Sequence, residues 1–179
     1  MQNYLDKLNG QIYTTVAKFK SSMPNNKRYL VSEYMRSPVI TIRPEATFRE
    51  AIELMLREKT NGLVVTDEQQ TLVGILSSWD IIEYIVPDYL ESDKHLAPFE
   101  DGSVFAKRIH ELADEPVRTF MTDAVHAVKP DSTIMEAAAT LSEHHIRQLP
   151  VTDEQNTVIG YLNRTDIKKI IGEVLGMNA

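Results

Sequence analysis

The sequence contains no cysteine, and this absence removes several kinds of chemistry at once. Without thiols the chain cannot form disulfides, bind a metal through thiolates or use a cysteine nucleophile. Glycine is also scarce, with seven in 179 residues, and no glycine-rich loop of the kind that cradles phosphates is present. The lack of cysteine fits a reducing compartment, so we expect a cytoplasmic protein.

Long apolar runs and excess positive charge are missing as well. No stretch approaches the roughly 20 apolar residues that span a bilayer, and the N-terminus lacks the apolar core of a signal peptide. Lys and Arg number 19 against 26 Asp and Glu, which gives a net charge of −7. This charge argues against a general binder of nucleic acids or anionic membranes. We therefore expect neither nucleic acid nor membrane among the partners.

One sequence unit occurs twice. Residues 31–85 align with residues 117–171 without a gap, and 19 of the 55 aligned positions are identical. The stretch Gly74–Asp80 (GILSSWD) returns as Gly160–Asp166 (GYLNRTD). Such a repeat predicts two similar subfolds, related by an approximate two-fold axis.

Each copy has the pattern of a strand, a helix, two strands and a final helix, which predicts an α/β (α+β) fold of two βαββα units. The first helix of each copy has the spacing of a capping box, at Thr47 with Glu50 and at Thr133 with Glu136. The final helices are expected to start near Ser78 and Arg164. The predicted strands are 39–42, 63–65 and 72–76 in the first copy, and 125–128, 149–151 and 158–162 in the second.

Segments outside the copies complete the predicted organisation. Residues 1–30 contain an amphipathic helix and a linker, and this helix packs either on the main body or on a second subunit. The copies occupy 31–86 and 117–171, and 172–179 is a tail. The arm at 87–116 reads as loop in its first half, with a helix opening at 104–109. Because it is long for a simple connector, we expect either a functional lid or a packing arm.

This order of pieces resembles the cystathionine β-synthase (CBS) domain, and the tandem resembles a Bateman module. The resemblance covers roughly residues 31–86 and 117–171. It implies a stand-alone CBS domain protein whose two units pack sheet to sheet, with a cleft on each side for an adenine nucleotide or an S-adenosyl compound, and which pairs into a homodimer. The matching pieces are 35–44, 47–51 and 74–80 in the first copy, and 121–130, 133–137, 149–151 and 160–166 in the second.

The two glycine-to-aspartate stretches supply the candidate ligand-binding residues. Family members that bind adenosine ligands usually have Ser or Thr three residues after the glycine and Asp three residues later. Ser77 with Asp80 fits this pattern, whereas the second copy has Asn163 with Asp166. A carboxylate accepts hydrogen bonds from both hydroxyls of a ribose, which suits the two aspartates. We therefore expect two clefts of unequal quality.

The other candidates concern the phosphate and the adenine. A hydroxyl and free N–H groups at a helix start bind phosphate, so Ser77 and Ser78 are expected to do so in the first copy, with Arg164 as a charged helper in the second. Arg147 lies where the family often has a basic phosphate ligand, and the first copy has Asn61 there. By resemblance, the adenine slots are lined by Val39 with Ile40 and by Val125 with His126, each facing the junction of the opposite copy.

Simpler roles stay open for several of these residues. Asp80 and Asp166 also have the spacing of helix caps, and Arg147 is also consistent with a solvated surface residue. The neighbouring His144 and His145 do not form a metal site, because adjacent helix positions point apart and a third ligand is missing. No nucleophile lies in a recognisable activating motif, so we expect no catalytic residues, no metal and no enzyme.

Two functional hypotheses follow. The first is a regulatory, ligand-sensing module that binds AMP, ADP, ATP or an S-adenosyl compound, requires no cofactor and acts on an unknown regulated protein. The second is a structural scaffold that binds no nucleotide and acts through dimerisation and partner contacts. In the second case, the N-terminal helix and the 87–116 arm would hold the partner.

Overall fold

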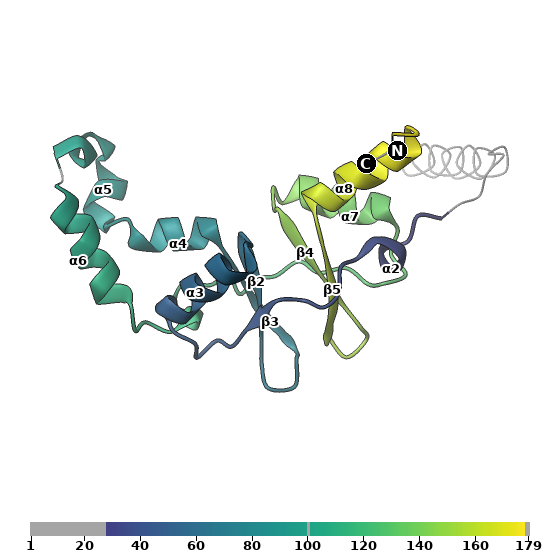
Figure 1. Ribbon diagram of the computed structural model, residues 1–179, viewed down its shortest axis with the longest axis horizontal. Helices are drawn as coiled ribbons and strands as arrows, with labels where there is room; N and C mark the ends of the chain where they lie inside the picture. The colour runs from purple at the N-terminus through teal and green to yellow at the C-terminus, as the bar shows by residue number, and fades with distance from the viewer. Residues whose placement is uncertain (1–27, 100, 178–179) are drawn as a thin grey trace, which may run out of the picture.

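The computed structural model describes residues 28–99 and 101–177, and its two halves repeat the same α/β architecture (Figure 1). The N-terminal helix expected within residues 1–30 lies outside the described residues. The first half comprises α2 (Val31–Tyr34), β1 (Thr41–Ile42), α3 (Phe48–Glu58), β2 (Gly62–Thr66), β3 (Leu72–Ser77) and α4 (Ser78–Ile85). The second comprises η2 (Val117–Thr119), α7 (Ile134–Glu143), β4 (Gln148–Thr152), β5 (Val158–Asn163) and α8 (Arg164–Val174). The halves are divided here by sequence, because α2 packs into the second core through Val31 and η2 into the first core through Val117.

The first helix of each half begins where the capping box predicts. The Thr47 hydroxyl accepts from the Glu50 N–H, and the Glu50 carboxylate accepts from the Thr47 N–H. Thr133 and Glu136 make the same reciprocal pair at α7. These contacts satisfy N–H groups that a helix start leaves without intrahelical partners, so both boundaries are confirmed.

The strand predicted at 125–128 is wrong for most of its length. In the first half, β1 pairs parallel with β2, and the Val64 N–H donates to the Ile40 carbonyl at 3.2 Å. The second half keeps only a single bridge, between Val128 and Val151. Pro150 occupies the position equivalent to Val64, and proline has no N–H to donate. The parallel pairing therefore cannot extend toward residue 126, and the second sheet has two strands.

The described part of the arm between the halves is mostly helical, which corrects the loop expected in its first half. It contains α5 (Asp88–Ser92), the 3-10 helix η1 (Lys94–Phe99) and α6 (Gly102–Leu112). Leu112 is buried in the first core, and Ile109 packs against it. Arg108 donates to the Tyr84 carbonyl of α4 at 3.2 Å. Through α6 the arm therefore packs against the first half.

The halves are joined by a crossed pairing at the centre of the molecule (Figure 1). Arg36, just before the first repeat's strand, exchanges two backbone hydrogen bonds with Tyr161 of β5 at 2.9 and 3.2 Å. Thr122, the equivalent position 86 residues later, exchanges two with Ile75 of β3, both at 2.9 Å. Each half therefore extends the hairpin of the other by one bridge.

Two glycines allow this close approach. A Cβ on Gly74 would lie 2.6 Å from the Met121 sulfur, and one on Gly160 would lie 2.6 Å from the Met35 sulfur. Each position is also 3.2 Å from a backbone carbonyl oxygen of the crossing segment. An added Cβ would therefore force the methionine side chain to move and the crossing backbone to shift by a few tenths of an ångström. Among the described residues, no helix is both long enough and apolar enough to cross a membrane.

We predict that Gly74→Ala and Gly160→Ala each lower the free energy of unfolding by about 1–3 kcal/mol, because overpacking displaces the methionine and the crossing segment. Urea denaturation measures the change. Gly102→Ala is the matched control, since no atom lies within 4 Å of its added Cβ. Equal stability of Gly102→Ala and Gly74→Ala would contradict the close packing at the crossing.

Candidate functional site

The predicted site in the first half is the junction of β3 and α4. Ser77 is the N-cap of α4, and its hydroxyl accepts from the N–H groups of Trp79 and Asp80 at 3.2 and 3.4 Å. One oxygen of Asp80, Oδ2, accepts from the Ser77 N–H at 2.7 Å and also from the Ser77 hydroxyl. Ser77 and Asp80 therefore form a capping box that fixes the carboxylate at the first turn of the helix.

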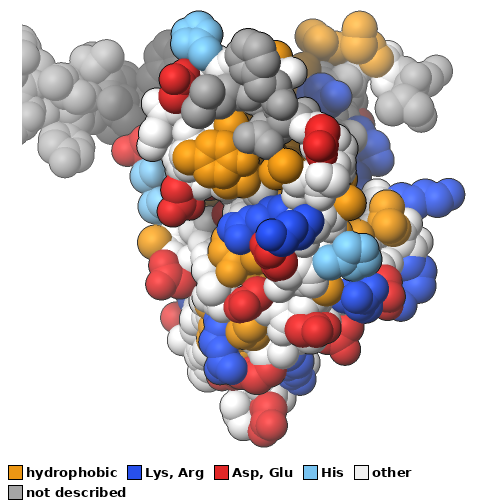
Figure 2. All heavy atoms as spheres, turned by 90° about the vertical axis from the view of Figure 1, so that its left-hand side faces the viewer, with side chains coloured by type: hydrophobic (Ala, Val, Ile, Leu, Met, Phe, Trp, Pro, Cys, Tyr) orange, Lys and Arg blue, Asp and Glu red, His pale blue; other side chains and the backbone are white. Residues whose placement is uncertain are grey.

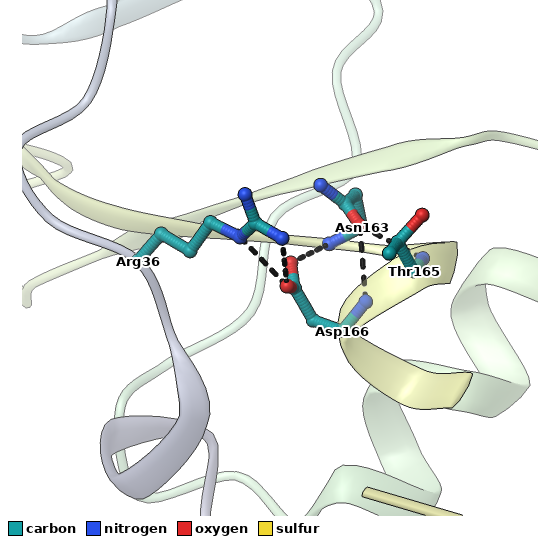
Figure 3. A network of polar contacts seen from close by, with 4 residues as sticks. All are labelled: Arg36, Asn163, Thr165 and Asp166. Carbon is teal, nitrogen blue, oxygen red and sulfur yellow. Dashed lines mark hydrogen bonds and ion pairs between the residues drawn. The ribbon is translucent and has the colours of Figure 1, made fainter. Parts of the chain in front are cut away.

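The second half builds the same junction from different residues (Figure 3). Asn163 caps α8, and its side-chain oxygen accepts from the N–H groups of Thr165 and Asp166 at 2.8 and 3.1 Å. Asp166 Oδ2 accepts from the Asn163 N–H at 3.0 Å. Asn163 thus fulfils the capping role that Ser77 has in the first half, and Asp166 takes the same place as Asp80.

The second carboxylate oxygen, Oδ1, is contacted in each case by a residue from the opposite half. Thr122 donates its hydroxyl to Asp80 Oδ1 at 2.7 Å. Its equivalent, Arg36, donates Nε to Asp166 Oδ1 at 2.6 Å, and a terminal guanidinium nitrogen lies 2.5 Å from the same oxygen. The hydrogen bond to Asp166 raises the pKa of Arg36 above its ordinary value. The two junctions are thus equivalent in position and differ in charge.

Burial adds to this difference. The Asp166 side chain is 7% exposed and that of Arg36 is 40% exposed. Asp80 is half-buried, and Thr122 is exposed. A hydroxyl on an exposed threonine turns to water at little cost, whereas removing a guanidinium leaves a buried carboxylate unpaired. Asp80 Oδ1 is therefore the carboxylate oxygen that an incoming hydroxyl donor reaches most readily.

The residues expected to bind phosphate are occupied by contacts to a neighbouring loop. The Ser78 N–H and hydroxyl both donate to the Asn61 carbonyl, at 3.0 and 3.3 Å. The Arg164 N–H donates to the Arg147 carbonyl at 3.3 Å. The Arg164 guanidinium donates to the carbonyls of Ile146 and His145, at 3.0 and 2.9 Å. In each repeat, Ser78 or Arg164 therefore links the first turn of the last helix to the loop that precedes the β-hairpin.

The other predicted residues are more scattered. The Arg147 side chain is exposed, and none of the ion pairs described for residues 28–99 and 101–177 includes it. Val39, Ile40 and Val125 are half-buried, and Ile40 packs against the first core. His126 is exposed, and its ring stacks on that of His144 with 3.5 Å between centroids. No hydrogen bond or ion pair described links these residues to the aspartates.

Arg36 and Thr122 are the contacts that sequence reasoning missed. Both follow a methionine that is identical in the two copies, Met35 and Met121, and both lie in segments that carry the resemblance. The one hint in the sequence is that the copies differ here, with arginine in the first and threonine in the second. This difference can be interpreted only when the structure shows that each residue contacts the aspartate of the other repeat.

A hollow on the surface of the second half lies apart from both aspartates. It has a volume of about 320 Å³ and lies between α7 and α8, and neither aspartate lines it. Its lining consists of Ala138, Leu141, Ser142, His145, Arg164 and Ile167. Within the described part of the chain, no group of three or more His, Cys, Asp or Glu side chains is arranged to hold a metal ion.

Comparison with known proteins gives a family and several relatives. The family model for the CBS domain matches residues 31–87 and 117–173. Homoserine O-acetyltransferase of Methanococcoides burtonii is 31% identical over 142 residues, which are 79% of this chain and 24% of that protein. The chain therefore spans about a quarter of the length of this relative. Chloroplastic CBSX2 of Arabidopsis thaliana is 29% identical, and the match covers 82% of this chain and 66% of CBSX2.

Solved structures resemble this fold closely. CBSX2 in complex with AMP has a TM-score of 0.64 at 27% identity, and the match covers 82% of this chain and 98% of that one. The CBS domain pair of protein MJ0100, in complex with 5′-methylthioadenosine and S-adenosyl-L-methionine, has a TM-score of 0.60 at 26% identity. That match covers 80% of this chain and 99% of the other.

We predict that Ser77→Ala lowers the free energy of unfolding by about 1 kcal/mol in the absence of any ligand, because α4 loses its N-cap. Thermal or urea denaturation measures this. Ser142→Ala is the matched control, since Ser142 is exposed within α7 and alanine favours a helix. If Ser77→Ala is as stable as the unchanged protein, Ser77 has no capping role.

Proposed function

This chain belongs to the CBS domain family, and on that premise we propose that it is a regulatory module that binds an adenosine-containing ligand between its two repeats. The ligand is an adenine nucleotide or an S-adenosyl compound. Its ribose lies at Asp80, next to the segment that leads into the second repeat. The module needs no bound cofactor for this role, and we assign it no catalytic activity.

The observation that carries the proposal is the state of Asp80. The capping box holds its carboxylate in place through Oδ2, while Oδ1 is held by one exposed hydroxyl, that of Thr122. The two hydroxyls of a ribose can both donate to a carboxylate, and such hydrogen bonds to a charged group are stronger than neutral ones. A ribose that replaces Thr122 therefore exchanges one hydrogen bond for two.

The relatives support the adenosine part of the ligand. AMP, 5′-methylthioadenosine and S-adenosyl-L-methionine, the compounds bound in the two solved relatives, share the adenine and the ribose ring with its 2′ and 3′ hydroxyls, and they differ in what the 5′ carbon carries. A contact to the ribose is common to all three. Asp80 is therefore expected to recognise the shared part, and residues elsewhere in the cleft to recognise the substituent.

Regulation follows from the position of the contact. Asp80 belongs to the first repeat, and Thr122 lies in the opening segment of the second, just after Val117 and Phe120, which are buried in the core of the first half. A ligand that takes the place of Thr122 therefore replaces a contact that holds this joining segment on the first half. Binding shifts a conformational equilibrium only through a difference in affinity for two states, and this exchange supplies such a difference.

We further propose a homodimer that uses the helices α4 and α8. Trp79 and Ile82 on α4 are 68% and 52% exposed, and Ile171 and Val174 on α8 are 53% and 60% exposed. Within each helix the two residues are three apart, so they share a face. In Figure 1 both helices lie on the same side of the sheets. An exposed apolar surface of this kind is typical of an interface.

A scaffold function is the second candidate, and the surface of the arm favours it. Figure 2 looks onto the end of the molecule formed by α5 and α6, where hydrophobic side chains lie among charged ones. Phe105 of α6 is 62% exposed, and Tyr89 of α5 is 45% exposed. Exposed aromatic side chains of this kind are common in protein interfaces, so this surface could bind the partner protein that both hypotheses require.

Calorimetry with AMP, ADP, ATP and S-adenosylmethionine tests ligand binding. We expect at least one of them to bind, and Asp80→Asn to weaken that binding about 10- to 150-fold, which corresponds to about 1.5–3 kcal/mol for hydrogen bonds to a charged group. Asparagine keeps an oxygen for the cap and loses the second acceptor. Asp88→Asn is the matched control, because Asp88 is exposed in the arm. Equal affinity of Asp80→Asn and the unchanged protein would contradict the assignment.

Analytical ultracentrifugation tests the dimer. We expect a dimer that Trp79→Glu together with Ile171→Glu converts to monomer, because buried charges without partners oppose association. Phe105→Glu, on the arm, is the matched control and is expected to stay dimeric. If only the Phe105→Glu control dissociates, the dimer interface lies on the arm and not on α4 and α8.

A further inference from the structure

The equivalent positions 36 and 122 give the two junctions different partners. Both residues make the same backbone bridge to the opposite hairpin, and both reach the same oxygen, Oδ1, of the aspartate that begins the final helix. Only the side chains differ: threonine contacts Asp80, and arginine contacts Asp166. The fold thus offers one aspartate with a neutral partner and one with a cation.

The partner decides what a ribose must displace. At Asp80, the displaced Thr122 hydroxyl is exposed and finds water. At Asp166, a ribose would break an ion pair whose carboxylate is 7% exposed, and it would offer neutral hydroxyls in place of a guanidinium. Breaking the pair returns a half-exposed guanidinium to water but leaves a buried carboxylate without a cation, and the neutral hydroxyls of a ribose offset that cost only in part. A neutral nucleoside therefore competes poorly with Arg36.

Arg36 itself is placed so that an anion from solution can reach it. Its side chain is 40% exposed, in contrast to that of Asp166. The guanidinium lies 5.9 Å from the centre of the Tyr161 ring, within the range of a cation–π contact. The backbone bridge to Tyr161 fixes the Cα of Arg36. The side chain beyond it is long and has several rotatable bonds, so the guanidinium can move from Asp166 to another anion. A guanidinium forms bidentate hydrogen bonds with a phosphate as it does with a carboxylate.

We propose that Arg36 is a built-in lock on the Asp166 junction. This inference rests on the proposed function and assigns a different ligand class to each junction. The Asp80 junction accepts any adenosine compound, including a neutral one. The Asp166 junction binds only a ligand that carries its own anion, such as a nucleoside monophosphate, because that anion takes over the guanidinium when the ribose displaces it from Asp166.

Isothermal titration with adenosine and AMP tests the lock, since adenosine has the ribose and no phosphate. We expect the unchanged protein to bind one equivalent of adenosine and two of AMP. Arg36→Thr copies the first junction into the second and is expected to bind two equivalents of adenosine, the new one at least tenfold tighter than in the unchanged protein. Arg57→Thr, which removes an exposed arginine of α3, is the matched control and is expected to bind one.

The reciprocal change guards against a folding defect in Arg36→Thr. Thr122→Arg places a cation beside Asp80 and is expected to abolish adenosine binding while both AMP equivalents remain. Circular dichroism melting of each variant shows whether it is folded.

Each outcome supports or overturns the lock. Two equivalents of adenosine in the unchanged protein, or only one in a folded Arg36→Thr, would overturn it, and a single equivalent of AMP in the unchanged protein would overturn the selection for anions. If the unchanged protein binds neither compound, the proposed function fails at Asp80. The lock is then supported if Arg36→Thr gains adenosine binding and overturned if it gains none.

Discussion

The crossed pairing, in which the opening segment of each repeat bridges to the last strand of the other repeat, is the constraint on which the rest of the structure depends. Four backbone hydrogen bonds, between Arg36 and Tyr161 and between Thr122 and Ile75, define it. Gly74 and Gly160 are needed because the crossing segments leave no room for a Cβ. The same crossing brings a side chain of one half to the aspartate of the other, so neither junction is complete within one repeat.

Much of the fold could be predicted because repetition and local chemistry agree. The hairpins and helices recur at the same offset, and the capping boxes at Thr47 and Thr133 start helices where hydroxyl and carboxylate spacing requires. The missing strand at 125–128 has a local cause, because Pro150 removes one donor from the pairing. The helices of the arm were harder to predict, since α5 and η1 carry little apolar periodicity.

The site was predictable in part for a different reason. Asp80 and Asp166 follow from the repeated stretch, but their partners lie 42 and 130 residues away in the sequence. Such contacts depend on the register of the crossing, which no local pattern encodes. A capping role for Asp80 is also compatible with the proposed ligand contact. Ser77 and Asp80 form the cap through one carboxylate oxygen and leave the other directed at the opposite half.

The central claim is that ligand and Thr122 compete for the same oxygen of Asp80. A crystal structure of the protein grown with AMP tests this most directly. The account predicts both ribose hydroxyls on the Asp80 carboxylate, with the hydroxyl of Thr122 turned away from it. AMP bound elsewhere, with the hydrogen bond from Thr122 to Asp80 intact, would contradict it.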